Sequence, residues 1–145
     1  MDLETWIKKM PKVELHVHLE GSVRPETLLL LAKRHLIPLP ASTVEELRAW
    51  YVFTDFAHFI EIYMAISGCL RTPEDMELIA REFLAGQAAQ NIVYSEVTWT
   101  PLNQYHTSGM GFVEQLAAIN RALFLSFLIL IKNVVFIENT IPSYL

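Results

Sequence analysis

The chain has 145 residues, of which 16 are acidic and 11 are basic, and its formal net charge at pH 7 is −5. The basic residues are scattered and form no patch, which excludes the electrostatic footprint expected of a nucleic-acid-binding protein. This length supports one domain with a core, but a complete (β/α)8 barrel needs about 250 residues. The single cysteine, Cys69, excludes an internal disulfide. Because residues 1–12 also lack the apolar core of a secretory signal, we expect a cytoplasmic protein.

Residues 13–20 alternate between apolar and polar side chains and read Val-Glu-Leu-His-Val-His-Leu-Glu. This period of two predicts a strand with His16 and His18 on one face, with their Cα atoms roughly 6–7 Å apart. Two imidazoles placed in this way can bind one divalent metal ion. An isolated His-x-His pair can also be an ordinary pair of hydrogen-bonded histidines, so the spacing alone leaves both interpretations open.

The alternation predicts that Glu14 and Glu20 share the face of the two histidines. Four such polar groups would be costly to bury in an ordinary core, which favours a metal site with a charged surrounding. Gly21 ends the predicted strand, and Pro25 suits the first position of a helix. The histidines are therefore expected near the C-terminal end of a strand, where parallel α/β folds build their active sites.

The segment Pro11–Ser22 reads Pro-Lys-Val-Glu-Leu-His-Val-His-Leu-Glu-Gly-Ser, and residues 24–28 read Arg-Pro-Glu-Thr-Leu. Together they resemble the N-terminal signature of the adenosine deaminase family, which belongs to the amidohydrolase superfamily. The likeness covers roughly residues 8–123. It continues more weakly through the segments 53–63, 70–75 and 93–97 and through Pro101.

The resemblance implies an α/β fold, namely the N-terminal portion of a (β/α)8 TIM-type metal-dependent hydrolase barrel, with residues 1–145 as one partial domain. It implies hydrolytic deamination of adenosine to inosine, with zinc as the metal and a small-molecule purine as substrate. His16 and His18 match the family's first two metal ligands, and His18 and Glu20 match positions that contact the substrate. Glu20 departs from the aspartate of nucleoside-specific members and also resembles the adenine deaminase branch, so adenine is the alternative substrate.

The family's other metal ligands and its catalytic glutamate come from later strands, and this chain has no counterpart of them. A catalytic zinc normally has three protein ligands, so we expect the chain alone to bind metal weakly and to lack turnover. Two further interpretations stay open. The chain could be a different amidohydrolase, or it could be a non-catalytic interaction module whose open strand edges pair with a partner.

After the first strand the sequence is mostly helical. The segment Val93–Thr100 favours a second strand, and the long helical crossover before it predicts that the two strands are parallel. The apolar positions within 56–64 are interpreted as a buried helix face, with the wall of a purine pocket as the alternative. Helices are predicted at 25–35, 42–50, 56–64, 73–90 and 112–123.

Three further polar residues are weighed as candidates for the site. His35 ends a predicted helix, where an interaction with the helix dipole explains it better than metal binding does. Glu96 is expected to tie neighbouring strands together through hydrogen bonds rather than to act as a functional acid. His106 is placed in a loop on the catalytic side, either as a substrate contact or as a solvated histidine.

The segment from Ala122 to Leu145 has only two charged residues, Lys132 and Glu138. Its apolar run is too short to span a bilayer, which needs about 20 residues. A buried third strand is predicted within Leu128–Ile137. This apolar tail departs from the family pattern, and we expect the chain to be a shortened or misjoined deaminase product.

Overall fold

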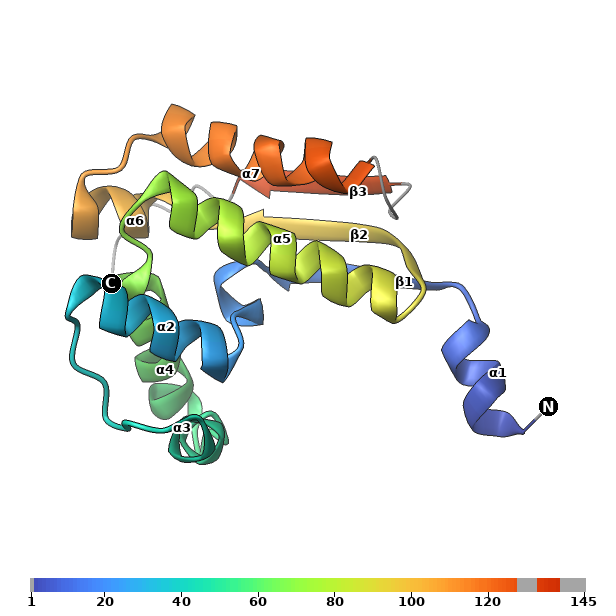
Figure 1. Ribbon diagram of the computed structural model, residues 1–145, viewed down its shortest axis with the longest axis horizontal. Coiled ribbons are helices and arrows are strands. Elements are labelled where there is room, and N and C mark those ends of the chain that lie inside the picture. Colours follow the sequence, from blue (N-terminus) through green and yellow to red (C-terminus); the bar gives the residue numbers. More distant parts are fainter. Residues whose placement is uncertain (1, 128–132, 139–145) are drawn as a thin grey trace.

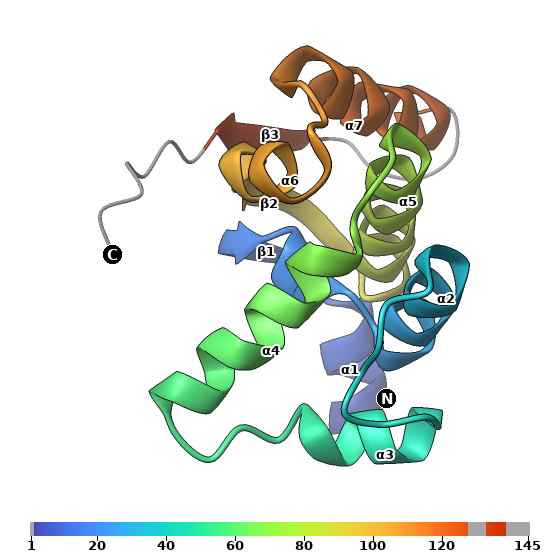
Figure 2. The same ribbon diagram turned by 90° about the vertical axis from the view of Figure 1, so that its left-hand side faces the viewer.

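The computed structural model describes residues 2–127 and 133–138, and it has the α/β organisation that the sequence predicts (Figure 1). Helices α5 and α7 connect successive strands, and they lie side by side over one face of a small sheet (Figures 1 and 2). The elements are α1 (Leu3–Lys9), β1 (Lys12–His18), η1 (Glu20–Ser22), α2 (Pro25–His35), α3 (Val44–Trp50), α4 (Phe56–Cys69), α5 (Pro73–Ala89), β2 (Ile92–Trp99), α6 (Pro101–Ser108), α7 (Phe112–Phe127) and β3 (Asn133–Glu138).

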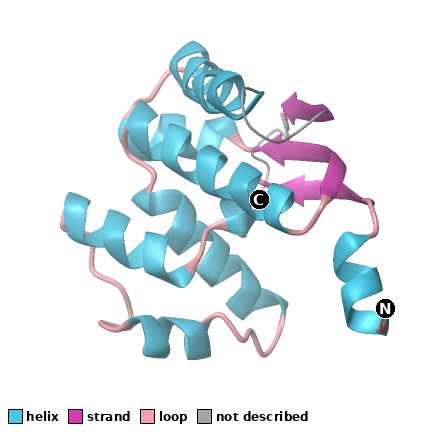
Figure 3. Cartoon of the chain, turned by 45° about the vertical axis from the view of Figure 1, so that its right-hand side comes forward, coloured by secondary structure: helices cyan, strands magenta, loops and turns pink. Residues whose placement is uncertain are grey.

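The described strands form one sheet in the order β1-β2-β3, and both pairs are parallel (Figure 3). The parallel pairing predicted for the first two strands is thus confirmed. The predicted third strand is present as Asn133–Glu138, whereas residues 128–132 of that prediction lie outside the described part of the chain. Since β1 has one described neighbour and β2 has two, β1 is an edge strand within the described residues.

Local capping explains where the main helices begin. The Thr43 side chain accepts a hydrogen bond from the Glu46 amide, and the Glu46 side chain bonds back to the Thr43 amide, so the capping box uses Thr43 rather than Ser42. Thr72 forms the same reciprocal pair with Asp75 at the start of α5, where Pro73 occupies the first turn. No helix in the described part of the chain is long and apolar enough to cross a membrane.

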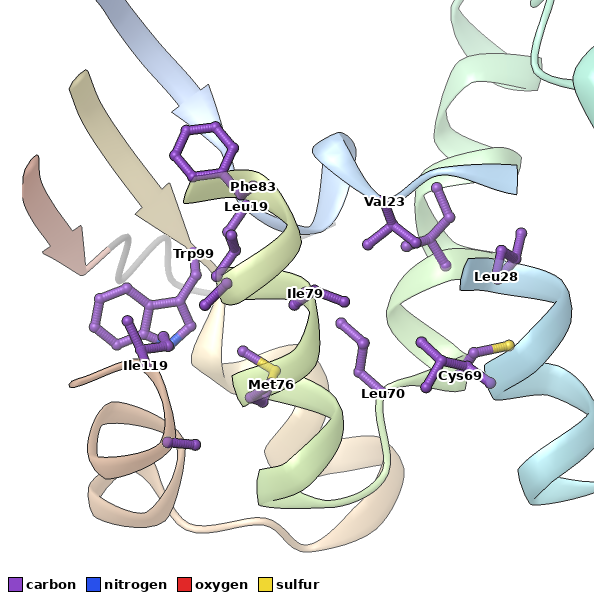
Figure 4. Close-up of a cluster of buried hydrophobic side chains, with 14 of the residues drawn as sticks. Leu19, Val23, Leu28, Cys69, Leu70, Met76, Ile79, Phe83, Trp99 and Ile119 are labelled. Carbon is purple, nitrogen blue, oxygen red and sulfur yellow. The ribbon is translucent and has the colours of Figure 1, made fainter. Parts of the chain in front are cut away.

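The hydrophobic core lies between the helix-covered face of the sheet and the helices packed against it. Met76, Ile79 and Phe83 project from α5 into this layer, between Trp99 of β2 and Leu70 at the end of α4 (Figure 4). Leu70 and Met76 are fully buried, and Ile79 is 2% exposed. Helix α5 thus packs between the end of β2 and the end of α4.

Two predictions about helices are wrong. Residues 101–108, expected to be a loop, form α6, because Pro101 starts a helix directly after β2 instead of only ending the strand. The aromatic face of α4 is not buried, since Phe56 and Phe59 are 75% and 40% exposed. The buried face of α4 is its C-terminal half, which carries Ile62, Ile66, Ser67 and Cys69.

Candidate metal and substrate site

β1 does not follow the simple alternation that its sequence predicts. Glu14 pairs with Ser95 and Val17 pairs with Val97, so β1 takes three residue steps where β2 takes two. The extra residue forms a bulge, and His16 adopts a φ of 60° within it. This left-handed conformation costs a non-glycine residue roughly 1–2 kcal/mol. Strain of this kind often lies at functional sites.

The bulge divides the polar face that the sequence predicts. Residues that pair across neighbouring strands share a face of the sheet, so Glu14 faces the helices together with Ser95. Val13 and Leu15 face the open side and are 62% and 58% exposed. The prediction that Glu14 shares the face of the histidines is therefore wrong, because one inserted residue reverses the phase of the strand.

His16 and His18 nevertheless remain neighbours at the C-terminal end of β1. Their ring centroids are 5.5 Å apart and the rings are tilted by 54°. Burial, reinforced by the nearby His16 ring, lowers the pKa of His18 below its ordinary value. A lowered pKa favours the neutral imidazole, which is the form that binds a metal.

The two histidines can supply two nitrogen donors to a divalent metal, and these donors suit zinc. Within residues 2–127 and 133–138, no group of three or more histidine, cysteine, aspartate or glutamate side chains could hold an ion. The donor set is consistent with two of the three protein ligands that a catalytic zinc normally needs. A third ligand would have to come from outside this set.

Glu20 begins the short helix η1 and is completely buried. Its Oε1 accepts a hydrogen bond of 2.8 Å from the Thr100 amide at the N-terminus of α6. Its Oε2 is buried and makes no hydrogen bond of good geometry with the described residues. Burial raises the pKa of Glu20, and interactions with the Thr100 amide, its own backbone amide and the Tyr63 side chain offset only part of this effect. An incompletely paired buried carboxyl group is costly, and contact with a ligand could offset that cost.

Tyr63 of α4 lies between His18 and Thr100 and contacts both. Its ring meets the His18 ring edge-on with centroids 6.0 Å apart, and its hydroxyl lies 3.2 Å from Thr100 Oγ1. Burial and the nearby Glu20 carboxylate both raise the pKa of Tyr63, so the phenol stays protonated. Tyr63 therefore presents a neutral hydroxyl between the end of β2 and the histidines.

A cavity of about 780 Å³ opens beside the histidines and extends around the edge of β1. Its size suits a small molecule. The wall formed by α4 is apolar and aromatic, which supports the pocket-wall interpretation of that helix over the buried-face interpretation. Glu20 is not part of the lining, since it lies beneath the surface. The lining includes His16, His18, Arg24, Phe59, Ile60, Tyr63, Met64, Thr100 and Asn103.

The other candidate residues lie away from the histidines or make structural contacts. His106 is exposed on α6, and the cavity is lined instead by Asn103 of the same helix. Glu96 accepts a hydrogen bond of 2.9 Å from Tyr94, so its bond stays within β2 and does not tie two strands together. His35 Nε2 lies 2.7 Å from Asp75 Oδ2, which makes it part of a contact between α2 and α5.

Arg24, Asn103 and Gln87 are not among the residues that the sequence patterns single out. All three line the cavity, and Gln87 is also buried between α5 and the strands. Asn103 is the third residue of α6, and proline as a helix-starting residue at position 101 is the signal that could have found it. Gln87 carries no signal of its own, because a glutamine in a long helix is ordinarily a surface residue.

The fold and the site define the first part of a metal-dependent hydrolase barrel. The adenine deaminase of Arthrobacter aurescens superposes with a TM-score of 0.79 at 31% identity, over 88% of this chain and 39% of the other. A zinc-bound amidohydrolase from Burkholderia ambifaria gives the same TM-score at 28% identity, over 92% and 36% of the two chains.

The adenosine deaminase family model matches residues 11–127, and the chain belongs to this family. The adenine deaminase of Wolinella succinogenes is 42% identical over 122 residues, which are 83% of this chain and 36% of that protein. The chain therefore spans about a third of the length of the curated relatives that it matches.

Proposed function

We propose that this chain provides the opening strand and crossover of a barrel that hydrolytically deaminates a 6-aminopurine. The observation that carries the proposal is the His16–His18 pair, whose rings lie 5.5 Å apart beside a cavity of about 780 Å³. This pair lies at the C-terminal end of a parallel strand, which is the functional end of such barrels. The reaction belongs to purine metabolism, and we propose a cytoplasmic location.

His16 and His18 would hold the metal, for which zinc is proposed, through one ring nitrogen each. When bound, such an ion lowers the pKa of water towards neutrality and so makes a nucleophile available at pH 7. The residues of this chain are proposed to bind the metal and to orient the substrate. The lowered pKa of His18 keeps its ring neutral, and the apolar wall of α4 keeps water away from a flat heteroaromatic substrate.

His18 and Glu20 are proposed to contact the substrate. Glu20 already has Oε1 fixed by the Thr100 amide, which leaves Oε2 to hydrogen-bond a polar edge of the purine. Because Glu20 is fully buried and is not part of the cavity lining, this contact requires a local rearrangement that exposes its carboxylate.

We propose adenine as the substrate in preference to adenosine. Glutamate at position 20 and the adenine deaminase relatives support this choice. Adenosine is the second candidate, and the description of the matching family model supports it. The isolated chain is expected to be inactive, because the described residues supply two metal ligands and no complete catalytic set.

The isolated chain provides the first test. Titration of the purified 145-residue chain with Zn²⁺ should show weak binding that His16→Ala abolishes, and neither adenine nor adenosine should change in absorbance. A soluble monomer that melts cooperatively and binds no metal would instead support the interaction-module alternative. Turnover by the isolated chain would contradict the proposal that its site is incomplete.

A chimera tests the proposed activity. Residues 1–127 of this chain are joined to the remaining part of the Wolinella succinogenes adenine deaminase, to which the chain is 42% identical. The chimera should release ammonia from adenine, and His18→Ala should abolish this release. The matched variant Glu20→Asp should lower the ratio of adenine to adenosine turnover. An active His18→Ala chimera would remove the basis of the proposal.

A further inference from the structure

A buried glutamine on α5 contacts both strands at one level of the sheet. Gln87 Nε2 donates a hydrogen bond of 2.5 Å to Glu14 Oε2, and Gln87 Oε1 accepts one of 2.6 Å from Ser95 Oγ. Gln87 is 4% exposed and Ser95 is 1% exposed. Glu14 and Ser95 also pair across β1 and β2, so a single side chain holds both members of one strand pair.

This pair belongs to the only displaced part of the described β1–β2 register. Lys12 pairs with Ile92 and His18 with Thr98, which is the same offset at both ends of the strand. Between them, Val13 and Glu14 are shifted by one residue relative to β2. One irregularity precedes Val13 and a second follows Glu14, and the second contains His16 with its φ of 60°.

The alternative to the observed conformation is a β1 strand that pairs with β2 in one regular register. Removal of both irregularities would restore the plain alternation of the sequence, relieve the positive φ of His16 and turn Val13 and Leu15 from solvent towards the helices. These changes favour the regular register. The regular register would, however, turn Glu14 away from α5. The buried Gln87 amide would then lose its carboxylate partner, and this cost opposes the regular register.

We propose that Gln87 is a positioning residue that fixes the bulge of β1 and, through it, the arrangement of His16 and His18. It acts on the histidines through its hydrogen bonds to Glu14 and Ser95, although Gln87 and Glu14 also line the cavity. The inference rests on the proposed function for its link to metal binding. Its structural part, the choice of register, is independent of that function.

The first test exchanges the two hydrogen-bonding groups. Gln87→Glu places two carboxylates against each other and should release Glu14, whereas the double variant Glu14→Gln/Gln87→Glu restores an amide donor to a carboxylate and keeps the acceptor for Ser95. Glu14→Gln alone keeps an acceptor for Gln87 and should behave as the parent chain does. Gln87→Met removes both hydrogen bonds without burying a charge. It replaces Gln87→Glu in the test if that variant does not fold.

The readout that needs no metal is the conformation of His16. In the metal-free parent chain, NMR should show the strong intraresidue HN–Hα NOE of a residue with positive φ. This NOE should be lost in Gln87→Glu and in Gln87→Met, and the double exchange should restore it. Retention of the NOE in Gln87→Met, or failure of the exchange to restore it, would overturn the proposal.

The second readout is the affinity for Zn²⁺, which should fall about tenfold in Gln87→Met. Thr27→Val is the matched control, since it removes the Thr27–Glu82 hydrogen bond of 2.5 Å between α2 and the same helix α5. The control should lower stability and leave both the NOE and the affinity unchanged; an equal loss of affinity in the control would contradict a positioning role. If the parent chain binds no Zn²⁺ at the histidines, the proposed function fails, while the NOE still decides the role of Gln87.

Discussion

β1 and β2 are neighbouring parallel strands with different positions in the sheet. β2 lies between two parallel strands and buries Ser95, Val97 and Trp99 at every second position. β1 has one described neighbour and reverses its phase at His16. A strand paired on both sides has its register fixed twice, whereas an edge strand can accommodate a bulge. Among the described strands, the residues proposed for chemistry thus lie on the bulged strand and not on the regular one.

The largest expected effect is a difference in the free energy of unfolding between substitutions on the helix-covered side and on the open side of the sheet. Ile79→Ala removes a fully enclosed side chain of α5 and should lower the free energy of unfolding by about 2–5 kcal/mol. Leu15→Ala, on the exposed side of β1, should change it by less than about 0.5 kcal/mol. Urea denaturation measures both values, and similar losses would show that the open face is as tightly packed as the covered one.

The next effect concerns the pH dependence of the packed side. Burial alone would raise the pKa of Asp75, but hydrogen bonds from the Arg71 and Thr72 amides and from His35 and Arg34 outweigh it, so the pKa is lowered. A carboxylate with a lowered folded pKa stabilises the fold above its unfolded pKa of about 3.9. This contribution is lost as the pH falls through the folded pKa.

Asp75→Asn tests this assignment. The variant should be less stable than the parent chain by about 1–3 kcal/mol at pH 7, and the difference should shrink as the pH falls below about 4. Urea denaturation between pH 2 and pH 7 measures it. A difference that stays constant over this range would mean that the charge of Asp75 contributes nothing.

A smaller effect is expected at His16 on the open side, where one substitution should raise stability and lower metal binding. His16→Gly relieves the positive φ, although glycine also adds freedom to the unfolded chain, so a gain of up to about 1 kcal/mol is expected. The same change removes one proposed metal ligand. Thermal unfolding and Zn²⁺ titration of the variant should therefore change in opposite directions. A loss of stability would show that the imidazole makes stabilising contacts.

The smallest effect is expected in α1, which has no buried residues and extends away from the sheet (Figure 1). Trp6 is 50% exposed, and Trp6→Ser should change the free energy of unfolding by less than about 0.5 kcal/mol. Urea denaturation followed by circular dichroism, with Ile79→Ala as the reference for a buried position, measures the change. A loss of more than about 1 kcal/mol would indicate a packing role for this helix.

Much of the fold could be predicted because its signals are local. Thr72, Pro73 and Asp75 specify the start of α5 within four consecutive residues. The aromatic face of α4 shows the limit of such signals. Its spacing is that of a buried stripe, but burial depends on which elements pack against it, and here that face is partly exposed and lines the cavity.

The sequence by itself determined the helices α2, α3, α4, α5 and α7, the two parallel strands and the proximity of His16 to His18, because capping groups, β-favouring residues and an i, i+2 spacing act over a few residues. Only the tertiary structure decided which way Glu14 points, how deeply Glu20 is buried and what Gln87 holds. Each of these depends on contacts between residues distant in the chain, and a one-residue bulge that reverses a strand's phase leaves no mark in the alternation itself.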